Sequence, residues 1–157
     1  MAHQTSNKIS KVKIYVKVVD KNYELIEHTA DIGIRVKGKT LAELFKNAGL
    51  AVFEIIAEKK QSAAGKPETI KIEQSADNLE ELFVNWLNEL LSLSAAKELI
   101  FSDFQIYKLD KTALKAAAIG SNTNGYKVNV EIKAATYCEL KMEKNSSGWM
   151  AEVIFDV

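Results

Sequence analysis

The sequence predicts a protein of the α+β class: a single domain in which two amphipathic helices cover one face of a largely antiparallel or mixed β-sheet. Its 157 residues match the usual size of one domain. Two stretches repeat apolar residues at helical spacing, and the C-terminal half alternates apolar and polar residues between turn signals. We expect a flexible lead-in over residues 1–10 and one domain over residues 11–157.

The two helices are predicted over residues 40–57 and 77–97, where apolar residues recur every three or four positions. Thr40 is expected to cap the first helix and Asp77 the second, because in each case a glutamate follows three residues later. Trp86 lies on the apolar face of the second helix and is expected in the core.

Strands are predicted wherever apolar residues alternate with polar ones. These segments cover residues 11–19, 23–38, 68–74, 99–110, 113–120, 126–144 and 149–157. The pair Asn124-Gly125 and the stretch NSSG at residues 145–148 are turn signals that separate the last three segments.

Charge and composition limit the classes of function. Lys plus Arg equals Asp plus Glu, at 21 each, so the chain lacks the basic excess typical of proteins that bind DNA or RNA directly. No apolar run approaches the roughly 20 residues of a membrane helix, and the polar start lacks the apolar core of a signal peptide. Cys138 is the only cysteine, which suits a reducing cytoplasm. We expect a cytoplasmic protein.

The stretch GIRVKGKT at residues 33–40 matches the spelling of a phosphate-binding P-loop. A working P-loop needs a flexible turn between its two glycines, but here the intervening residues alternate β-branched and long basic side chains and favour a strand. The preceding residues are also too polar for a central buried strand. The simpler interpretation is a strand, a turn at Gly38-Lys39 and a helix capped by Thr40.

Two clusters of oxygen-bearing groups could form a metal site. Glu27, His28, Thr29 and Asp31 crowd the start of one predicted strand, although a simple turn also accounts for such residues. Asp156 and the α-carboxylate of Val157 end the chain. If the last strand lies beside the strand that follows Asp31, three hard oxygen groups converge. Such ligands suit Ca²⁺, Mg²⁺ or Mn²⁺, whereas zinc is less favoured because no tetrahedral N/S ligand set is visible.

Further residues have both structural and functional interpretations. His28 could bind the same cation directly or orient one of its ligands. Cys138 is predicted to be a core residue and not a nucleophile, because no base or helix N-terminus is visible beside it. Lys133, Thr136 and Glu139 give their strand an unusual polar content, for which a solvated face is the simplest explanation.

Two long stretches resemble the signatures of a known family. They are YELIEHTADIGIRVKGKTLAELFKNAGLAVFEII and, at the end, EIKAATYCELKMEKNSSGWMAEVIFDV. The first is similar to the N-terminal signature of the archease family and the second to its C-terminal signature. The segments DNLEELFVNWLNELL and FSDFQI lie between them in the family's order. The resemblance covers about residues 22–157.

The resemblance implies a function. Archeases are small cytosolic proteins that activate the RtcB-type RNA ligase of tRNA splicing and RNA repair. That ligase uses GTP and divalent metal to guanylylate its own histidine before it joins RNA ends, and archease promotes guanylylation and repeated turnover. The family's metal site corresponds here to Asp31, Asp156 and Val157. The resemblance therefore implies an accessory protein and not an enzyme, with the ligase as partner and RNA contacted only indirectly.

The chain departs from the family pattern at two places. Cys138 stands where the family often has His, so any part of that His in metal or ligase contact is altered here. The segment over residues 11–19 lies upstream of the family's usual start. His28, Lys133, Thr136 and Cys138 are further candidates for supporting the metal ligands or contacting the partner.

Two other functions stay open at this point. A chaperone-like module would bind protein clients in an apolar groove between helices and sheet. A metal-dependent phosphohydrolase would use the same carboxylates, although two or three acids without a clear base or second metal make a thin catalytic set.

Overall fold

The computed structural model describes residues 22–26, 31–61 and 65–157. The strand expected over residues 11–19, the lead-in, and Glu27, His28 and Thr29 lie outside this part of the chain. The described elements, in order, are β1 (Tyr23–Ile26), β2 (Ile32–Gly38), α2 (Leu41–Ile56), β3 (Ala57–Lys59), β4 (Glu68–Ser75), α3 (Leu79–Lys97), β5 (Leu99–Leu109), β6 (Ala113–Asn122), the 3-10 turn η1 (Thr123–Gly125), β7 (Tyr126–Val128), β8 (Ala134–Asn145) and β9 (Gly148–Asp156).

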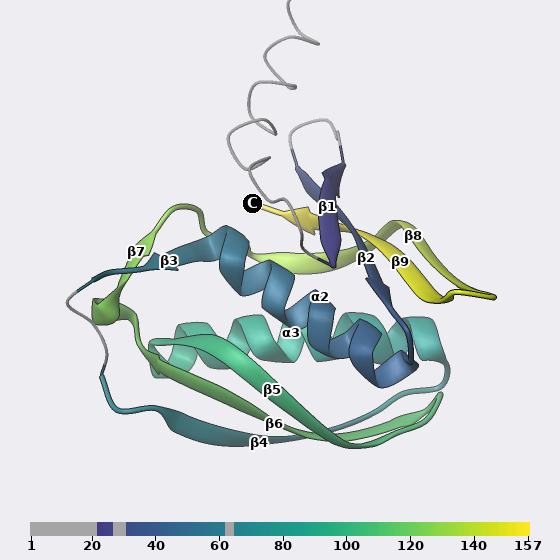
Figure 1. The fold of residues 1–157 in the computed structure, drawn as a ribbon, viewed down its shortest axis with the longest axis horizontal. Helices are drawn as coiled ribbons and strands as arrows, with labels where there is room; N and C mark the ends of the chain where they lie inside the picture. The colour runs from purple at the N-terminus through teal and green to yellow at the C-terminus, as the bar shows by residue number, and fades with distance from the viewer. Residues whose placement is uncertain (1–21, 27–30, 62–64) are drawn as a thin grey trace, which may run out of the picture.

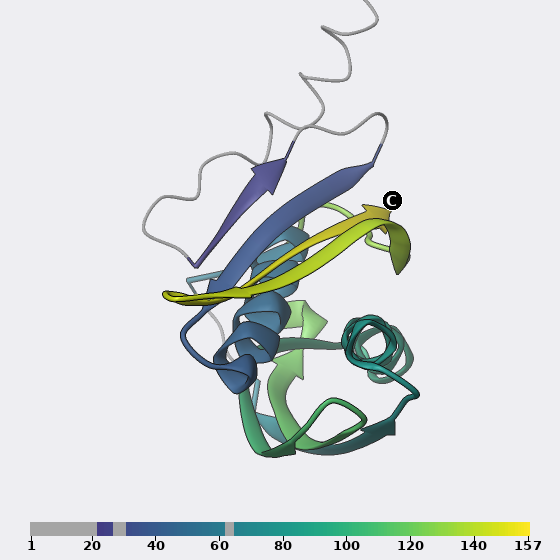
Figure 2. The same cartoon turned by 90° about the vertical axis from the view of Figure 1, so that its right-hand side faces the viewer.

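The helices lie between two antiparallel sheets (Figures 1 and 2). One sheet has the strand order β1-β2-β9-β8 and the other β4-β6-β5, while β3 and β7 form a small separate ribbon. Helix α2 contacts β2 and β9 on one side and β5 on the other, and α3 contacts β8 on one side and β4, β5 and β6 on the other. The α+β class with two helices and antiparallel strands is confirmed, but the described strands form three sheets and not one.

The sandwiched position of α2 explains why its buried surface is wider than an amphipathic stripe. The apolar residues at helical spacing are buried, and so is Phe53, which lies beyond the edge of that face. A helix covered by a sheet on both sides has little solvent-exposed surface to fill with polar residues. The capping prediction holds at its start: the Thr40 hydroxyl accepts a hydrogen bond from the Glu43 N–H at 3.1 Å.

The start of α3 differs from the prediction by one residue. The cap is Asn78, whose Oδ1 accepts the Glu81 N–H at 2.8 Å, while Glu81 Oε1 accepts the Asp77 N–H at 3.2 Å. The same capping box therefore exists, displaced from Asp77 and Glu80. This displacement buries Leu79 at the first helical position. Asp77, one residue earlier, precedes the helix and is exposed.

An aromatic cluster joins the helices to the three-stranded sheet β4-β6-β5. Phe45, Phe83 and Trp86 pack across the helices, with Phe45 and Phe83 edge to face at a centroid distance of 5.1 Å. Trp86 also packs against Phe104 of β5. The Trp86 side chain is fully buried, and its indole N–H donates to the Phe45 carbonyl at 2.9 Å, which satisfies its only polar group. The core position predicted for Trp86 is confirmed.

The segment predicted as one strand over residues 126–144 is interrupted. Residues 126–128 form β7 and pair with β3, whereas β8 begins at Ala134 and pairs with β9. Between them the chain passes the end of α2, where the Asn129 N–H donates to the Ile56 carbonyl at 2.7 Å. The segment predicted over residues 23–38 is likewise divided into β1 and β2, which pair antiparallel.

Neither described helix has the length and hydrophobicity that a membrane crossing requires.

Replacing the true cap of α3 should destabilise the protein, whereas replacing its neighbour should not. Asn78→Ala removes the acceptor of the Glu81 N–H and should lower the free energy of unfolding by about 1 kcal/mol. Asp77→Ala is the matched control, because Asp77 contributes its backbone N–H and not its side chain to the capping box. Urea unfolding of both variants measures the difference. A larger loss in Asp77→Ala would contradict the assignment.

The pairing of Tyr23 with α2 should make stability fall at alkaline pH. The Tyr23 hydroxyl donates to Glu54 Oε2 at 3.2 Å, and burial, followed by the nearby Glu54 charge, raises the pKa of Tyr23 far above its ordinary value. Below about pH 10 the phenol is neutral in both states and its contribution is complete. At higher pH the unfolded chain releases this proton first, so the free energy of unfolding falls by up to about 1.4 kcal/mol per pH unit.

Tyr23→Phe tests this linkage. At pH 8 the variant should be less stable by about 1 kcal/mol, the value of one hydrogen bond. Its deficit relative to the wild type should shrink between pH 10 and pH 11, since the variant has no phenol at this position to ionise. Urea unfolding at pH 8, 10 and 11 gives the comparison, with Tyr107→Phe at a 67% exposed side chain as the control. A deficit that stays constant with pH would refute the proposed coupling.

Candidate functional site: the carboxylate edge of the four-stranded sheet

The pairing of β2 with β9 brings Asp31 and Asp156 to facing positions at the end of the two strands. Ile32 is the register partner of Phe155, Asp31 immediately precedes Ile32, and Asp156 immediately follows Phe155. Residues directly opposite each other on antiparallel strands have Cβ atoms roughly 5 Å apart. Figures 1 and 2 both show the end of β9 beside the start of β2. Two acids separated by most of the chain thus meet at one edge, which we call the carboxylate edge.

The side-chain alternation of the sheet directs the two acids away from the core. Ile32 and Phe155 are buried on the face that covers the helices. Successive residues of a strand point to opposite faces, so the continued register assigns Asp31 and Asp156 to the outer face. Asp156 is exposed and Asp31 is half-buried.

The last residue is positioned by β8 and by the core. Ala134 of β8 is the register partner of Asp156, and the Lys133 N–H donates to the Asp156 carbonyl at 2.8 Å. Val157 packs partly buried against the hydrophobic core. Its α-carboxylate is therefore held one residue beyond Asp156, at the same edge.

The donor set of the carboxylate edge fits a hard divalent cation. Asp31, Asp156 and the α-carboxylate of Val157 supply only oxygen, and oxygen ligands are those preferred by Ca²⁺, Mg²⁺ and Mn²⁺. Within the described residues no group of three or more His, Cys, Asp or Glu side chains could hold a metal. Among the described residues, Asp31 and Asp156 supply the two side-chain carboxylates of this edge.

Asn88 of α3 fixes the start of β8 and was not identified from the sequence. Its Oδ1 accepts the Ala135 N–H at 2.7 Å, and its Nδ2 donates to the Ala135 carbonyl at 3.2 Å. This paired contact holds the backbone next to Ala134, the partner of Asp156. Its position among the apolar residues of LFVNWLNELL could have identified it, because a polar side chain on a buried helix face needs a nearby hydrogen-bond partner.

A wide bulge follows Thr136 in β8. Thr136 pairs with Ile154 and Lys141 with Glu152, so four residues of β8, from 137 to 140, face the single residue Val153. The Thr136 hydroxyl donates to the Ile154 carbonyl at 2.9 Å and accepts the Cys138 N–H at 3.3 Å, which fixes the base of the bulge. Glu139 adopts a positive φ of 52°, a conformation that non-glycine residues seldom occupy.

The bulge corrects the prediction for Cys138. Its side chain is exposed, not in the core, because the register shift removes residues 137–140 from the alternation that would have turned it inward. Tyr137 is 56% exposed for the same reason. Lys133 and Glu139 are exposed and Thr136 is half-buried, in agreement with the solvated face expected for them.

Comparison with known proteins gives the family. The model of the Archease protein family (MTH1598/TM1083) matches residues 23–157. The protein archease of Methanosarcina mazei is 38% identical over 143 residues, which cover 87% of this chain and 97% of that protein. The protein archease of Pyrococcus abyssi is 38% identical over 144 residues, which cover 87% and 99%.

Two solved structures share the fold. The solution structure of Methanobacterium thermoautotrophicum protein 1598 has a TM-score of 0.69 at 28% identity, and the match covers 87% of this chain and 99% of that one. The crystal structure of an archease from Thermotoga maritima, described as a possible chaperone, has a TM-score of 0.60 at 25% identity and covers 84% and 94%. With the family model matching most of its length, the chain belongs to the archease family.

Proposed function

We propose that this archease is an accessory protein that activates an RtcB-type RNA ligase in tRNA splicing and RNA repair. The observation that carries the proposal is the β2–β9 register, which aligns Asp31 with Asp156 beside the α-carboxylate of Val157. This edge offers a partner three negative oxygen groups on a rigid sheet. The ligase is the partner of this edge, RNA is reached from the edge only through the ligase, and the chain itself is not an enzyme. A cytoplasmic location suits a chain whose only cysteine is free and exposed.

The carboxylate edge is proposed to hold one divalent cation, Ca²⁺, Mg²⁺ or Mn²⁺, with zinc less favoured. Without a counter-charge the three groups repel each other, by about 1 kcal/mol per pair at 4 Å in water and more where solvent is excluded. A bound cation would neutralise part of the charge that develops on phosphoryl groups during guanylylation of the ligase. The strands supply the positioning, because Asp31 and Asp156 are backbone neighbours in a packed sheet.

The supporting residues have distinct parts in this proposal. Lys133 and Thr136 fix the backbone of β8 against β9 through the bonds to Asp156 and Ile154. Cys138 lies on the exposed bulge beside this edge and is available to contact the ligase. His28, outside the described residues, is proposed as a further ligand or as a hydrogen-bond partner of a ligand.

Binding of a divalent cation should stabilise the folded protein. A ligand that binds only the native state at 100 times its dissociation constant adds about 2.7 kcal/mol, which for a domain of this size raises Tm by roughly 5 to 10 °C. Differential scanning fluorimetry with Ca²⁺, Mg²⁺, Mn²⁺ and Zn²⁺ measures this shift. Asp156→Asn should abolish it, and so should one glycine added after Val157, which moves the terminal carboxylate.

The matched control for this measurement is Glu131→Gln, which neutralises another exposed carboxylate outside the edge. It should keep the full shift. An equal shift in the control, in Asp156→Asn and in the extended chain would mean that the cation binds elsewhere.

Activation of the ligase should depend on the same residues. Asp31→Ala and Asp156→Ala should each reduce archease-dependent guanylylation by at least about tenfold, which corresponds to 1.36 kcal/mol of transition-state stabilisation. The assay follows transfer of labelled GMP from GTP to the ligase, with and without archease, across several divalent ions. Glu131→Gln should stimulate like the wild type. Stimulation that both aspartate variants retain in full would reject the proposed mechanism.

A chaperone-like function is the second candidate, and one structural feature favours it. A groove of about 380 Å³ lies between the end of α3 and residues 128–132, and its walls include Leu91, Val128 and Val130. Val128 is 54% exposed, which is unusual for a large apolar side chain. Suppression of aggregation of unrelated clients, unchanged by metal and lost in Val128→Asp, would support this function over ligase activation.

A further inference from the structure

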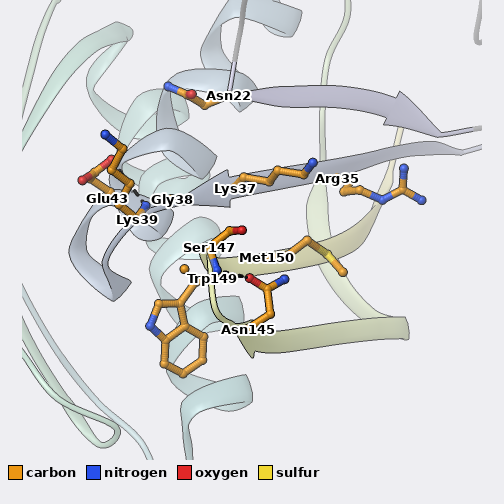
Figure 3. A pocket seen from close by; sticks show the side chains of 11 residues that line it. Asn22, Arg35, Lys37, Gly38, Lys39, Glu43, Asn145, Ser147, Trp149 and Met150 are labelled. Carbon is orange, nitrogen blue, oxygen red and sulfur yellow. Dashed lines mark hydrogen bonds between the residues drawn. The ribbon is translucent and has the colours of Figure 1, made fainter.

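A cavity lies at the opposite end of the four-stranded sheet from the carboxylate edge. It has a volume of about 450 Å³ and lies between the β2–α2 turn and the β8–β9 turn (Figure 3). Lys37 lies six residue steps after Asp31, which amounts to about 20 Å at roughly 3.3 Å per step. A ligand in this cavity, which we call the lysine pocket, would therefore not reach Asp31 or Asp156.

Two glycines form the floor of the lysine pocket by allowing one turn to pack directly on the other. A Cβ at Gly38 would lie 2.4 Å from the Leu44 nitrogen. A Cβ at Gly148 would lie 2.5 Å from the Gly38 carbonyl oxygen, and Gly148 has a φ of 127°. Because no side chain fits at either place, the backbones touch and the neighbouring side chains form the walls.

The walls of the lysine pocket are rich in hydrogen-bond donors. Lys37 and Lys39 are exposed, and neither ammonium group makes an ion pair with a described residue. Asn145 Oδ1 accepts the Ser147 N–H at 2.8 Å, which leaves the Asn145 amide nitrogen as a donor. Asn22 adds a second amide from the start of β1.

Charged neighbours of Lys37 and Lys39 limit the positive charge of the lysine pocket. Arg35 lies along the same wall, but its Nε donates to Glu152 at 2.7 Å and its Nη1 to Glu24, so its charge is already neutralised. Glu43 opposes one lysine charge and accepts the Lys39 N–H at 3.5 Å. Arg35 and its two glutamate partners together carry one net negative charge, so the charges in and around the pocket sum to zero and recognition rests on the hydrogen-bond donors.

We propose that the lysine pocket binds a phosphate-bearing, nucleotide-sized ligand, with Lys37, Lys39 and the Asn145 amide donating to its oxygens from different walls of the pocket (Figure 3). Charge-assisted bonds to phosphate are roughly twice as strong as neutral ones. A volume of about 450 Å³ lies within the range of small-molecule sites, so it accommodates more than an isolated phosphate. A free nucleotide and the terminal phosphate of an RNA strand both present this chemistry.

This binding mode is not that of a P-loop, although Lys37 and Lys39 belong to GIRVKGKT. Residues 32–38 form strand β2, so the backbone N–H groups between the two glycines do not surround a common point. The Glu43 N–H at the start of α2 already donates to Thr40. The motif is thus a strand and a cap, and the lysines are offered as side chains from the strand and from the turn that follows it.

Calorimetric titration of the full chain tests the proposal with three probes: inorganic phosphate, GTP, and a single-stranded RNA oligonucleotide ending in a 3'-phosphate. The double variant Lys37→Gln/Lys39→Gln should weaken binding by about tenfold or more, since it removes two charge-assisted hydrogen-bond donors. The control is Lys71→Gln/Lys127→Gln, which removes the same charge from exposed lysines outside the pocket. Circular dichroism melts verify that both variants fold.

The outcomes separate the sources of phosphate. Tighter binding of GTP than of the RNA supports the proposal with a free nucleotide as ligand. RNA that binds tighter than GTP, and loses affinity when its 3'-phosphate is replaced by a hydroxyl, supports it with an RNA end as ligand. The proposal is overturned if no probe gives saturable binding, or if the two double variants weaken binding equally. These measurements contain no ligase or divalent metal, so their failure would leave the carboxylate edge untouched.

Discussion

The antiparallel pairing of β2 with β9 is the constraint on which the candidate site depends. Its register is specified by burial: Ile34 faces Val153 and Val36 faces Ala151, all fully buried against the helices. A slip of one residue would turn these side chains toward solvent. At roughly 1.5–3 kcal/mol for each large apolar side chain, the core does not tolerate that exchange. The positions of the acids at the end of the pair follow from packing along its whole length.

A site made in this way needs no loop to arrange it. The last register pair of the two strands, Ile32 with Phe155, lies one residue from both acids, and β8 supports the chain end through Ala134. Asn88 extends this support to α3, since its amide bonds both backbone groups of Ala135. The terminus is often the least ordered part of a chain. Here it is the end of a central strand with a neighbour on each side.

Sequence patterns predicted the features that depend on neighbours along the chain. Both helices, the Thr40 cap and the burial of Trp86 follow from helical periodicity, and the convergence of Asp31 with Asp156 needed one assumption about strand pairing. Three features depended on distant contacts and were missed or wrong. The helices are covered on both faces, the α3 cap is Asn78, and the bulge exposes Cys138. Local alternation cannot reveal how many residues of one strand oppose a single residue of the next.

The two ends of β2 illustrate how a motif acquires meaning only from its fold. The letters of GIRVKGKT suggest phosphate chemistry through a backbone loop, yet residues 32–38 are a strand, and Gly38 is required because the Leu44 nitrogen lies where its Cβ would be. The cavity lined by Lys37 and Lys39 lies at this same turn. The strand therefore separates an acidic end, suited to cations, from a donor-rich end, suited to anions. A rigid sheet would keep the two proposed ligands about 20 Å apart, so each end could bind its ligand without neutralising the other.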